Sequence, residues 1–412
     1  MQTQLADFIR NTPEGEEAEA ILRACVHCGF CLATCPTYQV LGSELDSPRG
    51  RIYLMKQVLE GQVPTARTRL HLDRCLACRN CETTCPSGVQ YGRLLDIGRR
   101  VVERRTRRSL PERARRAALQ KGLLSPRLLA AALHAGRALR PLLPAVLRAK
   151  LPAAEAPQAW PARRHARYMV ALAGCVQRQL KPAINAAAAR VLDRLGISLQ
   201  EAPDAGCCGA LAWHMNDEAT GLAAMRRNVD AWSRQLDAGA EAIVMTASGC
   251  GAMVKEYGHH LRHDPAYAAR AARVAAAVLD IAEVLQREVP RLRELLRKKP
   301  LPHPVPHLAW HAPCTLQHGQ KINGVVEALL TLAGCELVPS AEAHLCCGSA
   351  GAYSLLQPEI SGTLKARKLE NLTAGQPQTI VTANIGCLTH LQSGTALPVR
   401  HWIELLDDLL RR

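Results

Sequence analysis

Two cysteine-rich stretches, CVHCGFCLATCP at residues 25–36 and CLACRNCETTCP at residues 75–86, decide the fold of the N-terminal part of this chain. Both read C-x2-C-x2-C-x3-C-P, the pattern that holds [4Fe–4S] clusters in bacterial two-cluster proteins. Three thiolates spaced by two residues on a tight loop can reach three irons of one cubane, and the fourth cysteine then ligates the neighbouring cluster. We therefore expect two ligand sets that exchange their fourth members: Cys25, Cys28, Cys31 and Cys85 for the first cluster, and Cys75, Cys78, Cys81 and Cys35 for the second.

Zinc held by four cysteines is the alternative use of such short spacings. Zinc ligands come as two separated pairs, whereas here a regular triplet followed by Cys-Pro occurs twice, so iron–sulfur clusters are favoured. His27 lies between two of the cysteines. Because four cysteines are already supplied, we expect His27 beside the ligands and not among them.

The 39 residues between the two motifs are expected to be helical. Ser47-Pro48-Arg49 is a helix-capping pattern, and the apolar residues of RIYLMKQVLEG, residues 51–61, recur at helical spacing. We therefore expect the cluster domain to be mainly α-helical.

The C-terminal part of the chain contains an internal repeat that is marked by its cysteines. In each copy a Cys-Cys-Gly triplet follows a single cysteine after 32 positions, and a last cysteine comes 42 positions after the pair in one copy and 40 in the other. The first copy comprises Cys175, Cys207, Cys208 and Cys250, and the second comprises Cys314, Cys346, Cys347 and Cys387. This agreement in spacing indicates a duplicated domain.

Short apolar or β-branched runs lead into these cysteines and indicate buried strands. They are YMVALAGC and AIVMTASGC in the first copy, and HLAWHAPC and TIVTANIGC in the second. Helical stretches such as residues 184–195 and 364–372 lie between them. The alternation predicts parallel βαβ units with right-handed crossovers, and it places the cysteines beyond the carboxyl ends of the strands, where ligands gather.

The fold class that follows is α+β and multidomain: an α-helical ferredoxin domain followed by a duplicated α/β, parallel βαβ, cysteine-rich domain. We expect the ferredoxin domain to span residues 1–100 and a basic, helical and proline-rich connector to span residues 101–165. The first Cys-Cys-Gly domain is expected at residues 166–290 and the second at residues 305–412.

The repeated cysteines have three candidate uses. The first is packing, because cysteine is often a small buried hydrophobe. The second is a redox, thiol or partner-facing site, and the third is a set of ligands for a further iron–sulfur centre. The duplication of their positions argues against packing alone, and the spacing leaves the other two uses open. Cys335 has no counterpart in the first copy and precedes an expected strand.

Composition excludes several classes of protein. The 17 cysteines, in a 412-residue chain that has no basic-then-apolar signal segment at its N-terminus, indicate metal ligation in a reducing cytoplasm. No run of about 20 apolar residues predicts a membrane span. The aromatic residues, 5 Trp, 7 Tyr and 2 Phe, leave few stacking platforms for nucleic acid, so nucleic acid is not an expected partner.

Much of the net charge of +16 is concentrated in an arginine-rich segment. We expect that segment to form either a solvated surface or a docking site for a partner or acidic lipid. Its arginines are Arg99, Arg100, Arg104, Arg105, Arg107, Arg108, Arg113, Arg115 and Arg116.

Nucleotide-binding and hydrolytic motifs are missing from the sequence: it has no P-loop, no H-E-x-x-H, and no G-x-G-x-x-G that opens a helix after a strand. We therefore expect no flavin or nicotinamide site and no catalytic residue on this chain. It is predicted to relay electrons and not to take a hydride from an organic substrate.

The whole architecture resembles that of the iron–sulfur subunits of glycolate oxidase. The most telling stretches are SPRGRI at residues 47–52 and RCLACRNCETTCPSGV at residues 74–89. The resemblance implies an electron-transfer subunit of a multisubunit glycolate dehydrogenase, inactive alone. In such a complex, flavoprotein subunits that carry FAD oxidise glycolate to glyoxylate, and the electrons pass through two [4Fe–4S] clusters towards a quinone-level acceptor. It also implies a cytoplasmic hetero-oligomer in peripheral contact with the inner face of the cytoplasmic membrane.

Related Cys-Cys-Gly complexes share the cluster motifs and supply the alternative function. These are the anaerobic glycerol-3-phosphate dehydrogenase, lactate utilisation and heterodisulfide reductase types, in which such a chain is an electron-transfer subunit or a catalytic subunit for thiol or disulfide chemistry. Heterodisulfide-type domains that hold a non-cubane cluster usually end in C-x-x-C, whereas neither Cys250 nor Cys387 is followed by a second cysteine. We therefore expect about eight irons per chain and not about twelve.

Overall fold

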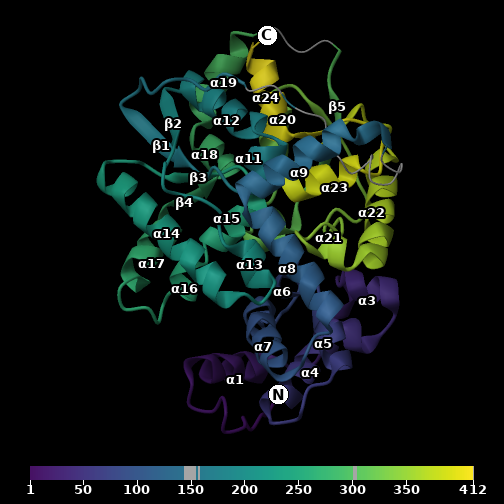
Figure 1. Ribbon diagram of the computed structural model, residues 1–412. Coiled ribbons are helices and arrows are strands. Elements are labelled where there is room, and N and C mark those ends of the chain that lie inside the picture. Colours follow the sequence, from purple (N-terminus) through teal and green to yellow (C-terminus); the bar gives the residue numbers. More distant parts are fainter. Residues whose placement is uncertain (143–154, 156–157, 300–303, 412) are drawn as a thin grey trace. The chain divides into compact units, whose positions relative to one another are not determined.

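The computed structural model describes residues 1–142, 155, 158–299 and 304–411 (Figure 1). The chain divides into two compact units. One comprises Met1–Ala117 and His344–Lys368 and is called the cluster unit below; the other comprises Ala118–Ala343 and Leu369–Arg412 and is called the sheet unit. The cluster unit is helical and the sheet unit contains two parallel sheets, so the predicted fold class is confirmed.

Short helices make up the cluster unit. They are α1 (Pro13–Ala24), α2 (Phe30–Ala33), α3 (Pro36–Leu41), the 3-10 turn η1 (Glu44–Asp46), α4 (Pro48–Leu59), α5 (Ala66–Asp73), α6 (Asn80–Thr83), α7 (Tyr91–Arg105), α21 (Tyr353–Leu356), and the first parts of α8 (Leu110–Leu124) and α22 (Pro358–Thr373). The predicted capped helix is α4. Ser47 Oγ accepts the Gly50 N–H at 2.9 Å, and Pro48 occupies the first turn, where its missing N–H leaves no bond unmade.

The core of the cluster unit forms where α4 packs on α7, because each helix buries an apolar face. Ile52 and Met55 of α4 and Leu94 and Leu95 of α7 are buried. Gly98 of α7 permits the close approach of the two helices, since a Cβ at this position would lie 2.4 Å from Met55 Sδ. This packing fixes the loops that carry the two cysteine motifs.

Two four-stranded parallel sheets form the sheet unit, with strand orders β2-β1-β3-β4 and β6-β5-β7-β8. In every neighbouring pair the strands run parallel, as predicted. The strands are β1 (Arg167–Ala171), β2 (Ile197–Glu201), β3 (Ile243–Met245), β4 (Val278–Asp280), β5 (His307–His311), β6 (Glu336–Val338), β7 (Thr379–Thr382) and β8 (Val399–His401).

The four runs chosen from the sequence correspond to β1, β3, β5 and β7, which are the inner strands of the two sheets. Inner strands of a parallel sheet are covered on both faces and read as continuous apolar runs. The edge strands β2, β4, β6 and β8 have polar or charged residues within three to five positions, as in ISLQE and VRH, and sequence reasoning missed them.

Helices connect the strands of the sheet unit. They are α9 (Pro126–Ala138), the 3-10 turn η2 (Arg140–Leu142), α11 (Val176–Leu180), α12 (Ala183–Arg194), α13 (Ala210–His214), α14 (Glu218–Asp237), α15 (Ser248–Val254), α16 (Tyr257–His260), α17 (Ala268–Ala277), α18 (Ile281–Arg287), α19 (Val289–Arg297), the π-turn η3 (Thr315–Gly319), α20 (Val325–Leu332), α23 (Ile385–Gln392) and α24 (Trp402–Arg411). The helical stretches expected at residues 184–195 and 364–372 lie in α12 and α22. The two copies meet where Asp407 of α24 pairs with Arg190 and Arg194 of α12 at 2.7 and 2.9 Å.

The predicted connector, residues 101–165, includes the end of α7 and all of α8 and α9, but its residues 143–154 and 156–157 lie outside the described part of the chain. The prediction that the arginines of this segment lie at the surface is wrong for two of them. Arg99 is buried and donates to the carbonyls of Leu72 and Cys75 at 2.7 and 2.8 Å. Arg108 is also buried and pairs with Asp73 at 2.7 Å. Both guanidinium groups hold the cluster unit together, because backbone carbonyls and a carboxylate face them.

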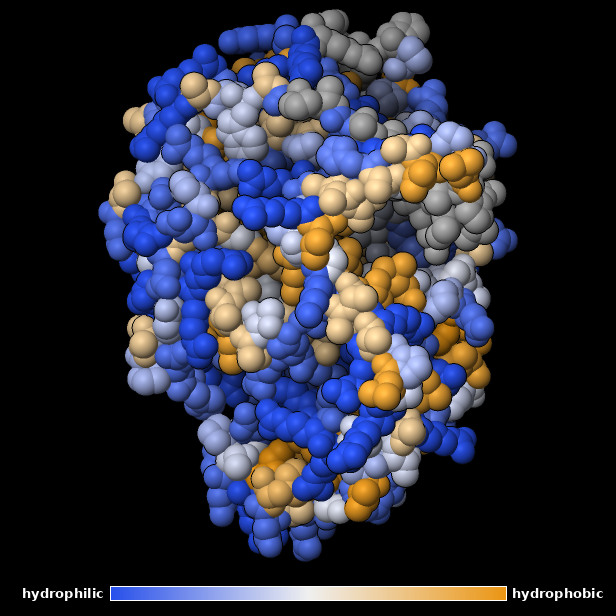
Figure 2. Space-filling view, viewed as in Figure 1, coloured by the Kyte–Doolittle hydropathy of each residue, from blue (hydrophilic) through white to orange (hydrophobic). Residues whose placement is uncertain are grey.

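Hydrophilic side chains predominate on the face drawn in Figure 2, and hydrophobic ones gather there in several separate patches. Exposed large hydrophobic side chains include Val26, Phe30 and Val63. Among the described residues, no helix combines the length and apolar character needed to cross a membrane.

Candidate metal centres

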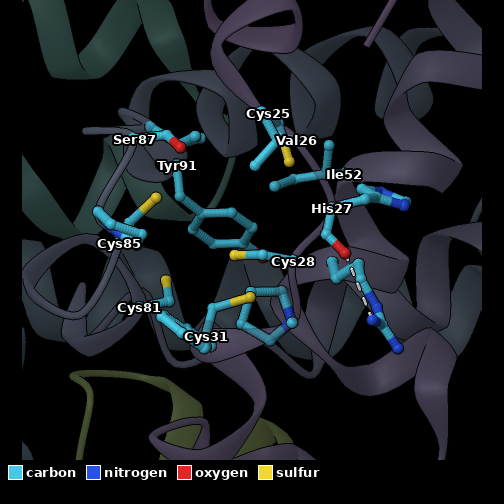
Figure 3. Close-up of a pocket in the computed structure, with 16 residues that line it drawn as sticks. Cys25, Val26, His27, Cys28, Cys31, Ile52, Cys81, Cys85, Ser87 and Tyr91 are labelled. Atoms are coloured by element: carbon cyan, nitrogen blue, oxygen red, sulfur yellow. Dashed lines mark hydrogen bonds between the residues drawn. The ribbon is translucent and has the colours of Figure 1, made fainter.

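One hollow in the cluster unit is lined by the first three cysteines of the first motif and the last cysteine of the second (Figure 3). Cys25 directly follows α1, Cys28 lies in the following loop, Cys31 lies in α2, and Cys85 follows α6. The hollow is called centre 1 below. Its cysteines, Cys25, Cys28, Cys31 and Cys85, are those that the sequence predicts for one cluster.

A second hollow is lined by Cys35, Cys75, Cys78 and Cys81 and is called centre 2. Here the fourth cysteine of the first motif lies with the first three of the second. Cys81 also borders centre 1, so the two hollows are neighbours within one unit. The structure therefore brings together both predicted sets of four, with their fourth members exchanged.

Both motifs reach this geometry through the same backbone turns. The third residue of each motif, His27 or Ala77, has a positive φ of 58° or 51°. The fifth residue, Gly29 or Arg79, has a φ of 89° or 60°. One left-handed residue in each gap between successive cysteines curls the loop tightly, so that sulfurs separated by two intervening residues face the same hollow. The ring of His27 points away from centre 1 in Figure 3, in agreement with its expected place beside the ligands.

The donor sets fit iron–sulfur clusters. Burial raises the pKa of the Cys31 thiol to about 11 and also raises the pKa of Cys25 and Cys81. Buried thiols of this kind ionise when a cation binds, because a coordinating metal deprotonates the thiol outright. Each hollow is lined by at least four cysteines, the number that a [4Fe–4S] cluster needs as ligands.

A buried ion cluster lies beside centre 2, and sequence reasoning missed it. Asp46 has an exposed fraction of 0% and faces three groups: Arg51 at 3.4 Å, His71 at 3.0 Å and Arg74 at 3.1 Å. Arg51 is 1% exposed and also donates to the His71 carbonyl at 2.7 Å. The sequence carries a signal for Arg51, because this residue shares the buried face of α4 with Met55 at a spacing of one helical turn.

The segment His344–Lys368, which contains the second Cys-Cys-Gly triplet, belongs to the cluster unit. Asn80, inside the second cysteine motif, donates to the carbonyls of Thr34 at 3.1 Å and His344 at 3.0 Å. The Tyr353 hydroxyl donates to the Arg74 carbonyl at 2.9 Å, one residue before Cys75. These bonds tie the segment to the loops of centre 2, an association that the sequence does not predict.

The four cysteines of the first Cys-Cys-Gly copy converge in the sheet unit. Cys175 and Cys207 form a hydrogen bond, as do Cys207 and Cys208, and Cys208 and Cys250. Hydrogen bonds from Cys175 and Cys208 lower the pKa of Cys207, while its bond with Cys207 and burial raise the pKa of Cys175. As predicted, each cysteine follows a strand of the first sheet: β1, β2 or β3.

Two buried polar side chains hold the Cys-Cys-Gly turn of this first copy. Asn228 donates to the Cys207 carbonyl at 2.9 Å, and Tyr257 donates to the Cys208 carbonyl at 2.8 Å. Asn228 also donates to the Tyr257 hydroxyl at 3.1 Å. Gly209 has a φ of 85°, which favours glycine, and a Cβ there would lie 3.0 Å from the Gly221 carbonyl oxygen.

The second copy is divided between the two units. Cys314 follows β5 and Cys387 lies in α23 of the sheet unit, where the Asn384 amide donates to Cys387 Sγ at 3.6 Å. Cys346 and Cys347 are buried residues of the cluster unit. Cys335 comes directly before β6, as expected, and burial raises its pKa to about 11.

Comparison with known proteins matches all three regions. Residues 21–89 match the family model of the 4Fe-4S dicluster domain, and residues 169–255 and 308–392 match that of the Cysteine-rich domain. The chain is 53% identical to the glycolate oxidase iron-sulfur subunit of Escherichia coli, with 100% of both chains covered. It is 32% identical to the probable glycolate oxidase iron-sulfur subunit of Bacillus subtilis, covering 94% of this chain and 91% of that one.

Lactate utilization protein A of Geobacillus thermodenitrificans shares 28% identity over 54% of this chain and 92% of its own length. The predicted alternative therefore has relatives too, but they cover only part of this chain. The full-length relatives and the two domain models show that the chain belongs to the family of glycolate oxidase iron–sulfur subunits.

Proposed function

We propose that this chain is the electron-transfer subunit of a glycolate dehydrogenase complex, an oxidoreductase. It receives electrons from a flavoprotein subunit that oxidises glycolate to glyoxylate and passes them towards a quinone-level acceptor. The observation that carries the proposal is the pair of adjacent hollows, each lined by cysteines drawn from both motifs, with Cys81 bordering both. The names of the two full-length relatives support the substrate.

The ligand assignment follows from the lining of the hollows. Cys25, Cys28, Cys31 and Cys85 would hold one [4Fe–4S] cluster, and Cys75, Cys78, Cys81 and Cys35 would hold the other. Each cluster supplies reversible one-electron transfer when bound. The chain's own residues position the sulfurs, exclude water and set the local charge.

Centre 1 supplies the face from which a redox partner approaches. Cys28 is exposed, and its neighbours Val26 and Phe30 have exposed fractions of 67% and 61%. Exposed apolar side chains around an exposed ligand suit a protein partner, because they are buried when the partner docks. We assign this face to the flavoprotein subunit, so that the complex is a hetero-oligomer with FAD on the partner only.

The test uses the purified chain with and without its flavoprotein subunits. The chain alone is expected to show the broad visible absorption of iron–sulfur clusters, to contain no flavin, and to leave glycolate unoxidised. Glycolate should bleach that absorption only after the flavoprotein is added. A stoichiometric flavin in the single chain, or glycolate oxidation by it alone, contradicts the proposal.

The four converging thiols of the first Cys-Cys-Gly copy form a second candidate redox site. Their contacts favour a redox or thiol role over packing, because hydrogen bonds from Cys175 and Cys208 lower the pKa of Cys207. We propose that they remain thiols, so that an anaerobically purified chain contains about eight irons. Iron near twelve per chain that falls to about eight in the Cys207→Ala/Cys208→Ala variant would instead make this site a third cluster.

Association with the inner face of the cytoplasmic membrane rests on the arginines that remain at the surface. Arg104, Arg105, Arg107, Arg113 and Arg115 are exposed on α7, α8 and the turn between them. Their attraction to acidic lipid is screened by salt. Sedimentation with vesicles containing acidic lipid should therefore weaken as salt rises and weaken further when Arg104 and Arg107 are changed to Glu; binding that is insensitive to both returns the segment to a solvated surface.

A further inference from the structure

Centre 2 lies next to buried positive charge. Arg51 is 1% exposed, and Arg99 is 8% exposed and donates to the carbonyl of the ligand residue Cys75 at 2.8 Å. One buried carboxylate, Asp46, pairs with Arg51. Charges that are shielded from water interact over longer distances than exposed ones, because the local dielectric is low. These two guanidinium groups would therefore stabilise the added negative charge of a reduced cluster held at centre 2.

Two hydroxyl groups also reach the sulfurs of centre 2. The Tyr91 hydroxyl donates to Cys75 Sγ at 3.5 Å, and the Thr37 hydroxyl lies 3.3 Å from Cys35 Sγ. Arg51 donates to Thr37 Oγ1 at 3.0 Å, and the Thr37 hydroxyl donates to the Asp46 carbonyl at 2.9 Å. When Cys35 is a thiolate ligand, its sulfur is a charged acceptor 3.3 Å from the same hydroxyl and competes with that carbonyl for the proton. Hydrogen bonds to the sulfurs are one of the factors that set the potential of an iron–sulfur cluster.

Centre 1 has a different environment. Arg49 is partly exposed, pairs with Glu44 at 2.8 Å and donates to the His27 carbonyl at 3.5 Å. The N-terminal ammonium of Met1 donates to the Cys25 carbonyl at 2.7 Å. Within the described part of the chain, no side-chain hydroxyl donates to the sulfurs of Cys25, Cys28, Cys31 or Cys85. The cations beside centre 1 are closer to solvent, where screening weakens them.

We propose that Tyr91, and Arg51 acting through Thr37, are positioning residues that raise the reduction potential of the cluster at centre 2. The inference rests on the proposed function, which assigns a cluster to Cys35, Cys75, Cys78 and Cys81. The physical basis is that reduction adds one negative charge to the cluster. Hydroxyl bonds to its sulfurs and a buried guanidinium stabilise that charge. The arrangement favours an electron resting at centre 2 after it enters at centre 1.

The test is a potentiometric titration of the purified holo-chain with dithionite as reductant, followed by electron paramagnetic resonance. Thr37→Val and Tyr91→Phe each remove one hydroxyl and keep the shape of the side chain. Thr34→Val and Tyr53→Phe are the matched controls, because the Thr34 hydroxyl donates to the Cys31 carbonyl, not to a sulfur, and Tyr53 is exposed. A Cys78→Ser variant identifies the signal of centre 2, since it changes one ligand of that centre alone.

The expected result is a downward shift in the reduction potential of centre 2 in Thr37→Val and Tyr91→Phe, with unchanged iron content and an unchanged centre 1. Thr37→Ser, which keeps the hydroxyl, should retain the wild-type potential of centre 2. If Thr37→Val loses iron, the potential of Thr37→Ser and that of Tyr91→Phe test the inference instead. Unchanged potentials in both variants, or a shift confined to centre 1, overturn the inference. If the inference is overturned in this way but glycolate and the flavoprotein still reduce the chain, the proposed function stands. If the purified chain contains no such clusters, both the inference and the proposed function are wrong.

Discussion

The two Cys-Cys-Gly copies have the same spacing in sequence and different surroundings in the structure. In the first copy the cysteine pair lies in the same unit as Cys175 and Cys250 and is held by Asn228 and Tyr257. In the second copy the pair belongs to the cluster unit, and the segment around it is bonded to the loops of centre 2.

The local turn is nevertheless conserved between the copies. Gly209 and Gly348 have φ angles of 85° and 89°. The Gly348 carbonyl accepts a hydrogen bond from Ser361 at 2.8 Å. The turn thus has the same backbone conformation in both copies, whereas its hydrogen-bond partners differ between them.

The largest effect that separates the copies is expected from Gly348→Ala. A Cβ at Gly348 would lie 2.7 Å from the Ser361 carbonyl oxygen, in a left-handed conformation that costs a non-glycine residue about 1–2 kcal/mol. The steric clash and the backbone cost together should lower the free energy of unfolding of the cluster unit by roughly 2–4 kcal/mol. The variant should therefore lose its cluster absorption at a lower concentration of denaturant.

Gly209→Ala is the matched control for this prediction. It places a Cβ 3.0 Å from the Gly221 carbonyl oxygen, within the sheet unit. In this variant, the denaturant concentration at which half of the cluster absorption is lost should equal that of the wild type. Amide exchange in α13 and α14 should become faster. Equal effects of both variants on the clusters would remove the difference between the copies.

A second comparison uses the last residues of two equivalent edge strands, Asp280 in β4 and His401 in β8. Burial raises the pKa of Asp280 to about 7 and lowers the pKa of His401 to about 4. The stability that neutral Asp280 contributes is complete below pH 4 and is lost as the pH rises towards 7. The contribution of neutral His401 is complete above about pH 6.5 and is lost as the pH falls towards 4.

Between pH 5 and 6.5 the two groups therefore act in opposite directions. In Asp280→Asn, whose amide oxygen can still cap α18, stability should rise with pH; in His401→Gln it should fall with pH. Each slope should approach roughly 1 kcal/mol per pH unit, which is about 1.5 kcal/mol across the range. Denaturant unfolding followed by circular dichroism at several pH values measures both, and equal slopes in the two variants would show that neither residue is neutral in the folded state.

The smallest effect is expected from Tyr353→Phe, which removes the hydrogen bond to the Arg74 carbonyl. A typical net loss of about 1 kcal/mol should appear as faster amide exchange in the loop that begins at Arg74. Tyr53→Phe removes an exposed hydroxyl elsewhere in the same unit and should leave that exchange unchanged. Exchange that does not differ between the two variants would mean that Tyr353 does not hold the loop.

The sequence was sufficient for the features that depend on local spacing. The cysteine motifs, the cap at Ser47 and the inner strands of both sheets follow from periodicity and residue type. Edge strands such as VLD and VRH are too short and too polar for that reasoning.

Long-range contacts were beyond the reach of sequence reasoning. The burial of Arg51, Arg99 and Arg108 depends on carbonyls and carboxylates that only the folded chain brings close. The membership of His344–Lys368 in the cluster unit depends on Asn80 and Tyr353 in the same way.

The exchanged ligand sets are tested by the paramagnetic resonance of the reduced Cys85→Ala and Cys35→Ala variants. Each of these residues is proposed to belong to the cluster of the other motif. Cys85→Ala should therefore perturb the signal of the cluster on Cys25, Cys28 and Cys31, and Cys35→Ala should perturb the one on Cys75, Cys78 and Cys81. If each variant instead changes only the cluster of its own motif, the exchanged ligand sets are wrong, and with them the arrangement of the two centres.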